Sequence, residues 1–462
     1  MQLYNTLERA TVPFTPSNPD RVSIYLCGPT VQSEPHLGHG RSAVAFDVLR
    51  RYLTWLGYEV DFVRNVTDID DKIIARANEL GTTTERVAAD AAEAFADADG
   101  KLGNLLPTRE PKATEHIDQM VDMIEKLIDT DHAYAVEGNV YFAVRSFPAY
   151  GKLSRHDISD LRSGERVEVD DRKRDPLDFA MWKAAKPGEP SWDSPWGLGR
   201  PGWHIECSVM AQEFLGETFD IHGGGTDLIF PHHENEIAQA EAMTGETFAR
   251  YWMHNGMLNL SGEKMAKSTG HVITLAGALD VWDPVAVRLF YLRTHYRKPL
   301  DYSEPALRDA ESSLERLRAF RRRVVQPLED PPRPDVLDRF KASMDDDLDV
   351  AGALAVLFDT VREGNSALDS GEDASVLVAA FDEMISVLGL TVPECLDADD
   401  GSVAEFAATF GLENGSMDEL LELRSRARRE GDWAKADAIR DGLAELNIIV
   451  EDTSNGARWH RN

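Results

Sequence analysis

The fold is decided by VSIYLCGPTVQSEPHLGHGRSAVAFDVLRRYLTWLGYEVDFVRNV, residues 22–66. The apolar run 22–28 leads through a turn containing Pro and Gly into apolar residues at helical spacing, which stop at Gly57 before a second strand pattern. This strand, helix, strand order predicts a doubly wound α/β sheet of the nucleotide-binding type. Such sheets bind ligands beyond the carboxyl ends of their strands, so Cys27 and the turn after it are expected to lie at the binding edge.

The composition is that of a large protein without a membrane segment. A chain of 462 residues with 42% hydrophobic content is long enough for about three domains. No apolar window is long enough to cross a bilayer, and the first residues lack a signal-peptide pattern, so we expect a soluble, cytoplasmic protein that does not bind membranes. Three cysteines (Cys27, Cys207 and Cys395) are too few for a disulfide framework, which leaves two uses: small buried apolar residues, or metal ligation and catalysis.

The charge is strongly acidic, with 81 acidic against 49 basic residues and a formal net charge of -32. Such a charge ordinarily argues against a polyanionic partner. However, only 13 of the 49 basic residues are lysine, and acidic stretches recur along the whole chain. This pattern indicates a halophilic protein that works in concentrated salt, where the Debye length falls to about 3 Å and repulsion hardly reaches a partner. Nucleic-acid binding therefore stays open.

Composition shifts divide the chain. Residues 83–130 have a helical pattern, 133–200 are expected to be an irregular insertion rich in Gly, Pro and Trp, and a second α/β stretch follows. Beyond residue 300 long amphipathic helices are expected, and an acidic joint precedes a basic helix and a small terminal unit. The predicted segments are the first half of the α/β domain at 1–105, a connective insertion at 106–200, the second α/β half at 201–262, a loop region at 263–325, a helical bundle at 326–398 and a C-terminal domain at 399–462.

Two histidines stand at the start of the first long helix. His36 and His39 lie about one helical turn apart in PHLGHGRS, with Gly38 between them. A helix N-terminus attracts anions, and glycine allows a ligand to approach the backbone. Two imidazoles there can donate hydrogen bonds to a phosphate, although a pair of surface histidines explains the pattern as well.

Two lysines stand in SGEKMAKSTG. Lys264 and Lys267 are flanked by Gly262 and Gly270, in a chain that has few lysines. Mobile ammonium groups on such a loop can neutralise the charge that develops on a leaving pyrophosphate. The alternative is an ordinary solvated polar loop.

A candidate metal site is spread over three segments. In PHHENEIAQA, His232 and Glu236 have i, i+4 spacing, so on a helix they project from one face. Cys207 in GWHIECSVMA and Cys27 can complete a set of two thiolates, one imidazole and one carboxylate, which suits zinc. Spacing alone does not show that the three segments meet.

These motifs together resemble the class I aminoacyl-tRNA synthetases and, within them, the cysteinyl-tRNA synthetase family. HLGH at 36–39 is similar to the HIGH signature and KMAKS at 264–268 to the KMSKS signature, with Leu37 in place of isoleucine and Ala266 in place of serine. Leu37 has a similar apolar volume, whereas Ala266 removes one hydroxyl. Further similar blocks run along the whole chain: YLCGPTVQSEPHLGH, RNVTDIDDKII, RPGWHIECSVMA, FDIHGGGTDLIFPHHENEIAQ, YWMHNGML and SNGARWHRN.

The resemblance implies a split Rossmann-type catalytic domain, a helical bundle and a small tRNA-binding domain that contacts the anticodon. It implies an enzyme, a cysteine–tRNA ligase, that activates L-cysteine with ATP and Mg²⁺ and transfers it to the 3′ end of tRNA(Cys), and that is expected to be a monomer. The residues that match family positions are the zinc ligands Cys27, Cys207, His232 and Glu236; the ATP contacts His36, His39 and Lys267, with Gly38 and Lys264 beside them; and Thr67, Trp203 and His222 in the amino-acid pocket.

Two other functions remain open. One is a ligase that joins activated cysteine to an amino sugar in thiol-cofactor synthesis, which shares the zinc site and both signatures but lacks a tRNA-binding C-terminus. The other is a zinc- and RNA-binding module without catalysis. In the C-terminal part, Arg424, Arg426, Arg428 and Arg429 can meet phosphates and Trp433 or Trp459 can stack on a base, although ion pairs with acidic neighbours explain the arginines equally well.

Overall fold

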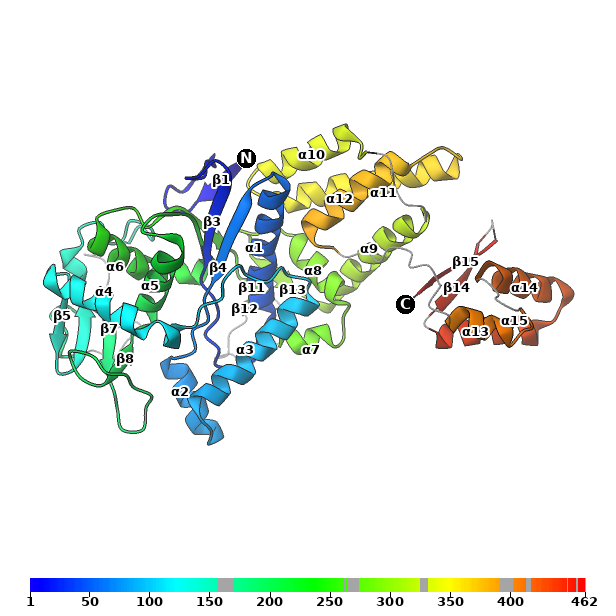
Figure 1. The fold of residues 1–462 in the computed structure, drawn as a ribbon. Helices are drawn as coiled ribbons and strands as arrows, with labels where there is room; N and C mark the ends of the chain where they lie inside the picture. Colours follow the sequence, from blue (N-terminus) through cyan, green and yellow to red (C-terminus); the bar gives the residue numbers. More distant parts are fainter. Residues whose placement is uncertain are drawn as a thin grey trace.

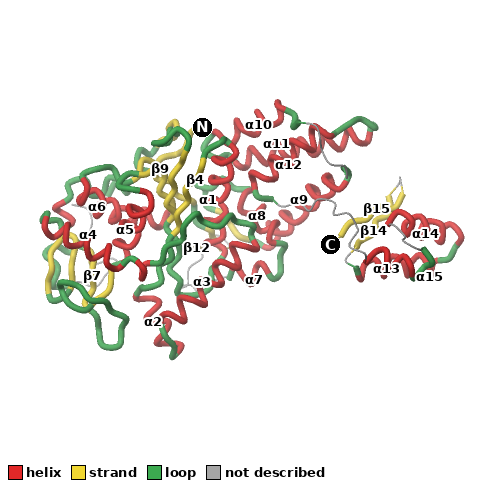
Figure 2. The backbone as a smooth tube through the Cα atoms, viewed as in Figure 1, coloured by secondary structure: helices red, strands yellow, loops and turns green. Residues whose placement is uncertain are grey.

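The computed structural model describes residues 1–156, 170–260, 263–264, 274–324, 331–390, 402–412, 417–446, 448–453 and 456–461. Figure 1 shows a central sheet with an α/β insertion on one side, and helices on the other side that continue into a bundle. The last helices and strands form a separate small unit at the far end. The tube in Figure 2 shows that helices predominate on the bundle side and that strands are concentrated in the sheet and the insertion.

The central sheet has four parallel strands in the order β10-β9-β3-β4. The strands are β3 (Arg21–Leu26), β4 (Glu59–Arg64), β9 (Phe219–Gly225) and β10 (Ala249–Asn255). From β3 the chain moves outward to β4, and from β9 it moves outward in the other direction to β10. The topological switch point therefore lies between β3 and β9, where a doubly wound sheet binds its ligand. The predicted fold class is confirmed.

Helix α1 (Leu37–Trp55) connects β3 to β4, as the spacing predicts. It packs on β4 and β9, whereas α5 (Trp203–Leu215) packs on β3 from the other side of the sheet (Figure 1). Alternate residues of β3 serve the two faces, because Ile24 belongs to the core around α1 and Tyr25 to the core around α5. The third crossover helix, α6 (Glu234–Thr244), connects β9 to β10.

The insertion is more regular than its composition suggests. Helices α3 (Thr84–Lys101) and α4 (Ile117–Asp129) confirm most of the helical stretch expected at 83–130, which is interrupted at 102–116, and α2 (Asp71–Leu80) precedes it. The expectation of an irregular segment at 133–200 was wrong for four short strands and right for most of the described residues between them. Short strands pair there as an antiparallel sheet, and the Gly and Pro residues mark its turns: β5 (Ala133–Val136), β6 (Asn139–Phe142), β7 (Phe179–Ala184) and β8 (Gly199–Pro201).

The remaining elements are two short sheets, the helices of the bundle side and a terminal unit. An N-terminal hairpin, β1 (Gln2–Asn5) with β2 (Ala10–Pro13), precedes the sheet, and β11 (Leu258–Leu260), β12 (Glu263–Lys264) and β13 (Leu300–Tyr302) form a small sheet after it. The helices on the bundle side are α7 (Leu275–Leu279), α8 (Pro284–Leu292), α9 (Glu304–Arg322), α10 (Pro334–Asp345), α11 (Val350–Asp369) and α12 (Ser375–Leu388). The terminal unit contains α13 (Ser402–Ala408), α14 (Met417–Glu430), α15 (Trp433–Glu445), β14 (Ile448–Thr453) and β15 (Gly456–Arg461).

Across the described ranges, no helix combines the length and apolar character that crossing a membrane requires.

A buried ion pair connects helix α1, which packs on the central sheet, to the helices of the bundle side. Arg288 of α8 is fully buried and pairs with Asp47 of α1, and its Nε donates to the Leu388 carbonyl at the end of α12, at 2.8 Å. We expect Arg288→Met to lower the free energy of unfolding by about 3–5 kcal/mol, because it leaves a buried carboxylate and a buried carbonyl without this donor. Urea-induced unfolding measures this change. Arg362→Met is the control, because the Arg362 pair with Asp359 is exposed; an equal effect of both substitutions would contradict the assignment.

Candidate metal centre and nucleotide pocket

Four side chains from separate segments meet at the switch point. Cys27 directly follows β3, Cys207 lies in α5, and Glu236 lies in the first turn of α6. His232 belongs to the π-helical turn Ile229–His233 that leads into α6. Their ligand atoms all lie within 4.8 Å of one another, so the predicted convergence of three segments is observed.

The distances between these donor atoms fit a four-coordinate zinc site. Sγ of Cys27 lies 3.7 Å from Sγ of Cys207 and 3.4 Å from Oε1 of Glu236. Nε2 of His232 lies 3.6 Å from Sγ of Cys207 and 3.1 Å from Oε1 of Glu236. Bonds of about 2.3 Å to sulfur and about 2.0 Å to nitrogen or oxygen separate tetrahedral donors by about 3.3–3.8 Å. The four side chains are therefore spaced as ligands of one ion.

The surroundings also favour a bound cation. Glu236 is fully buried and Cys207 is 1% exposed, so an isolated charge there is costly. Burial, and then electrostatic repulsion from His204 and His222, hold the pKa of His232 well below its usual range. The imidazole is therefore neutral and can coordinate a metal. Removal from water, together with Cys207 and Glu236, raises the pKa of the Cys27 thiol. A cation among these groups reverses that penalty because thiolates bind it directly.

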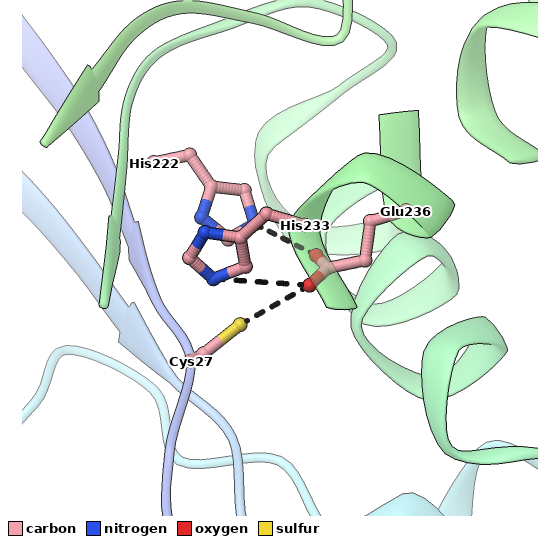
Figure 3. Close-up of side chains that lie close together, drawn as sticks. All are labelled: Cys27, His222, His233 and Glu236. Carbon is pink, nitrogen blue, oxygen red and sulfur yellow. Dashed lines mark hydrogen bonds and ion pairs between the residues drawn. The ribbon is translucent and has the colours of Figure 1, made fainter. Parts of the chain in front are cut away.

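A second group of possible ligands shares two of these residues. Figure 3 shows Cys27, His222, His233 and Glu236 gathered around the Glu236 carboxylate. His222 bonds Oε2 of Glu236 at 2.8 Å, whereas Nε2 of His233 lies 4.0 Å from Oε1. His222 therefore orients the carboxylate whose other oxygen faces the thiols, a role typical of groups just outside a metal site. The set with two sulfurs matches zinc better.

Further histidines support this centre and were missed by sequence reasoning. His204 bonds His232 through their Nδ1 atoms at 2.9 Å, and His233 bonds His254 at 2.8 Å, which in turn bonds Thr6. These contacts fix the ring orientations and tautomers of the inner imidazoles. The adjacent pair in PHHENE was a signal for His233, whereas His254 comes from β10 and had no local signal.

Of the three residues expected in the amino-acid pocket, Trp203 lines the neighbouring cavity, whereas His222 and Thr67 are buried and absent from its lining. The ring of Trp203 stacks on His232 at 4.0 Å, and His222 contacts Glu236 as described. Thr67 is buried and donates a hydrogen bond to Oε2 of Glu206 at 2.8 Å. Gly28 follows Cys27 where a Cβ would lie 1.6 Å from the Asn65 carbonyl oxygen, so only glycine allows this close approach.

The two signature histidines cap helix α1. Nδ1 of His36 accepts a hydrogen bond from the Gly38 amide, and Nδ1 of His39 accepts one from the His36 amide, both at 3.1 Å. A neutral ring that accepts at Nδ1 carries its proton on Nε2, so both imidazoles are fixed as Nε2–H donors. The rings stack with centroids 3.7 Å apart. The pair therefore forms an organised double donor at a helix N-terminus, and its binding of a phosphate stays a prediction.

One cavity of about 320 Å³ joins the two sites. Its lining includes Cys27 and Trp203 from the region of the metal centre, and His36, Gly38 and His39 from the start of α1. The backbone of Lys264 lies in β12, which pairs with β11, and its side chain lies outside the described part of the structure. Lys267 lies outside the described residues, as does Ala266.

Comparison with known proteins agrees with this architecture. The family model described as "tRNA synthetases class I (C) catalytic domain" matches residues 13–312, and a DALR domain matches residues 339–392. Methionyl-tRNA synthetase of Mycobacterium tuberculosis, solved with methionyl-adenylate, superimposes with a TM-score of 0.59 at 15% identity over 80% of this chain and 89% of that one. At that identity the likeness concerns the fold alone. The protein is a class I aminoacyl-tRNA synthetase in fold and catalytic domain.

Closer relatives narrow the class. The model of a cysteinyl-tRNA ligase anticodon binding domain matches residues 414–459. Cysteine–tRNA ligase of Streptomyces avermitilis is 49% identical over 99% of this chain and 98% of its own length, and that of Alkalilimnicola ehrlichii is 50% identical over 100% of both. The chain belongs to the cysteine–tRNA ligase family.

Proposed function

We propose that this protein joins L-cysteine to tRNA(Cys) at the expense of ATP and selects cysteine with a zinc ion held by Cys27, Cys207, His232 and Glu236. The observation that supports this most directly is the single cavity that connects the two-sulfur cluster to the double imidazole donor at the start of α1. The first end suits a thiol and the second suits a phosphate, which is the pair of functions that cysteine activation requires.

The four ligands would hold zinc with two thiolates, a neutral imidazole and a carboxylate. When bound, zinc favours the substrate thiol, as its thiolate, over the hydroxyl of serine, a larger difference than the roughly hundredfold that an apolar pocket achieves between such isosteres. Trp203 lines the cavity beside Cys27 and restricts the space for the amino acid, whereas His222 and Thr67 are buried outside the lining and are assigned to the support of this region. A separate editing domain is then unnecessary.

The first step is attack of the cysteine carboxylate on the α-phosphorus of ATP. A carboxylate oxygen forms the new bond to phosphorus while the bond to the pyrophosphate oxygen breaks, so no protein nucleophile is needed. We assign to His36 and His39 the Nε2–H donors that stabilise the phosphate charge, and to Gly38 the close approach of the nucleotide. Lys264 and Lys267, together with Mg²⁺ that accompanies ATP, are assigned to the leaving pyrophosphate.

The second step is attack of a terminal ribose hydroxyl of tRNA on the adenylate, with AMP as the leaving group. The terminal unit carries the features proposed for holding the tRNA. Arg426 and Arg429 are exposed on α14, and the Trp433 ring is 60% exposed beside the half-buried Arg428. Arg424 is buried, at 5% exposure, so its assignment as a phosphate contact was wrong. The side chain of Trp459 lies outside the described residues.

The alternatives make different demands on the same chain. An amino-sugar ligase has no use for an anticodon-binding unit, which this chain carries at residues 414–459. A silent zinc- and RNA-binding module has no use for the organised Nε2–H pair of His36 and His39. We also propose that the protein is a monomer that works in the cytoplasm in concentrated salt. Its proposed domain boundaries follow residues 105, 200, 262, 325 and 398.

Metal removal tests the proposal. We expect a zinc chelator to remove one zinc ion per chain and to abolish cysteine-dependent ATP–pyrophosphate exchange, because the thiol then has no metal partner; added zinc should restore it. Serine is expected to support little exchange in either form. Rapid exchange with cysteine by a protein shown to be free of metal would refute the role of zinc. Zinc binding without any cysteine-dependent exchange would favour the silent module.

A further inference from the structure

A buried tyrosine beside the metal cluster has no role in the function described so far. Tyr25 is fully buried in β3, and its hydroxyl makes no hydrogen bond within ordinary limits. Buried hydroxyl groups are nearly always hydrogen-bonded, because an unpaired one costs about 1–3 kcal/mol. This hydroxyl therefore lacks a partner that the working protein is expected to supply.

The strand geometry directs Tyr25 toward the cluster. Tyr25 and Cys27 are two residues apart, so they face the same side of the sheet, and Tyr25 packs in the same core as Cys207 of α5. The rings of Phe219 and His222 lie 6.3 Å and 5.3 Å from the Tyr25 ring and occupy its flanks. A phenol is protonated at neutral pH, so the Tyr25 hydroxyl is available as a hydrogen-bond donor.

The acceptor strength of the sulfur depends on the metal. A neutral thiol is a weak acceptor, whereas a thiolate accepts a strong, charge-assisted hydrogen bond. Cys207 is the candidate acceptor because it packs in the same core as Tyr25, and its sulfur lies 3.7 Å from that of Cys27, which faces the same side of the sheet as Tyr25. The unpaired hydroxyl is thus complementary to the cluster with its sulfurs ionised and coordinated, and poorly matched to the cluster with neutral thiols.

We propose that Tyr25 is a positioning residue that donates its hydroxyl hydrogen bond to the metal-bound sulfur of Cys207 and thereby strengthens zinc binding. The proposal rests on the zinc site of the proposed function. Tyr25 itself touches neither ATP nor cysteine, since it is absent from the lining of the cavity. Its effect reaches the substrate through the electron density that the sulfur gives to the metal.

Tyr25→Phe tests this in the full-length protein. We expect zinc affinity, measured by competition with a chromophoric chelator, to fall about 10–100-fold, the usual effect of losing a hydrogen bond to a metal ligand. In the cobalt-substituted protein the sulfur-to-metal charge-transfer band should move to longer wavelength, because the thiolate gains electron density. The melting temperature of the metal-free protein should stay the same or rise, since the substitution removes an unpaired buried hydroxyl.

Tyr251→Phe is the matched control. The Tyr251 hydroxyl in β10 accepts a hydrogen bond from the Thr15 amide at 3.0 Å and donates one to the Pro13 carbonyl at 3.2 Å. Neither bond involves a thiol. Its loss should lower the melting temperature and leave zinc affinity and the cobalt spectrum unchanged.

The outcomes separate the two proposals. Wild-type protein that binds no zinc would defeat the metal site and this inference together. Wild-type protein that binds zinc, with Tyr25→Phe equal to it in affinity and cobalt spectrum, would overturn only the role of Tyr25. A fall in zinc affinity matched by a lower melting temperature of the metal-free variant, with an unchanged cobalt spectrum, would assign Tyr25 to packing and also overturn the inference.

Discussion

Cys207→Ser is expected to lose zinc and cysteine activation together. Serine has nearly the same volume, so the buried position in α5 remains filled, but a hydroxyl stays protonated at neutral pH and is a poor zinc ligand. The three remaining donors would leave Glu236 buried without its cation. We expect cysteine-dependent exchange to fall about a thousandfold or more, which corresponds to about 4 kcal/mol of transition-state stabilisation. Metal analysis and the exchange assay on the same preparation measure both losses.

Cys395→Ser is the control for this substitution. Cys395 is the third cysteine of the chain, in the acidic joint, and no function is assigned to it. It should retain zinc and full exchange activity. If Cys207→Ser keeps its activity while metal analysis finds no zinc, the zinc mechanism of selection is wrong.

The four candidate ligand residues could be named from the sequence, but their meeting could not be derived from it. Cys27 and Cys207 are 180 residues apart, and their 3.7 Å separation depends on β3 lying beside β9 and on α5 packing against β3. Local periodicity predicts β3, α1 and β4 because those residues have neighbours close in sequence. The order β10-β9-β3-β4 is set by long-range packing, which periodicity does not encode.

Local patterns also fail where a residue's environment comes from elsewhere in the chain. Arg424 was grouped with Arg426 and Arg429 by composition, yet the packing of α14 buries it. The antiparallel strands β5–β8 are short and separated by turn residues, so their composition resembled irregular chain. The salt adaptation rests on surface composition alone and stays a prediction.

The HLGH segment shows what structure adds to a motif. The sequence indicated two imidazoles near a helix start, without their tautomers. Because both Nδ1 atoms accept backbone amide hydrogens, His36 and His39 serve at once as helix caps and as fixed Nε2–H donors. Capping thus sets the protonation site that phosphate binding requires, so substitutions at His36 must separate the two roles.

His36→Asn makes that separation. Asparagine is a good N-cap and can still accept the Gly38 amide, so helix α1 should keep its start, but its short side chain cannot place a donor where Nε2–H lies. We expect the kcat for cysteine-dependent exchange to fall about 10²–10³-fold, the usual effect of losing one donor to developing charge, with zinc content unchanged. His36→Ala loses the cap as well and should be less stable by about 1 kcal/mol, yet equally slow. If His36→Asn keeps the exchange rate of the unchanged protein and His36→Ala does not, the imidazole acts through the helix cap. The assignment of His36 to the phosphate is then wrong.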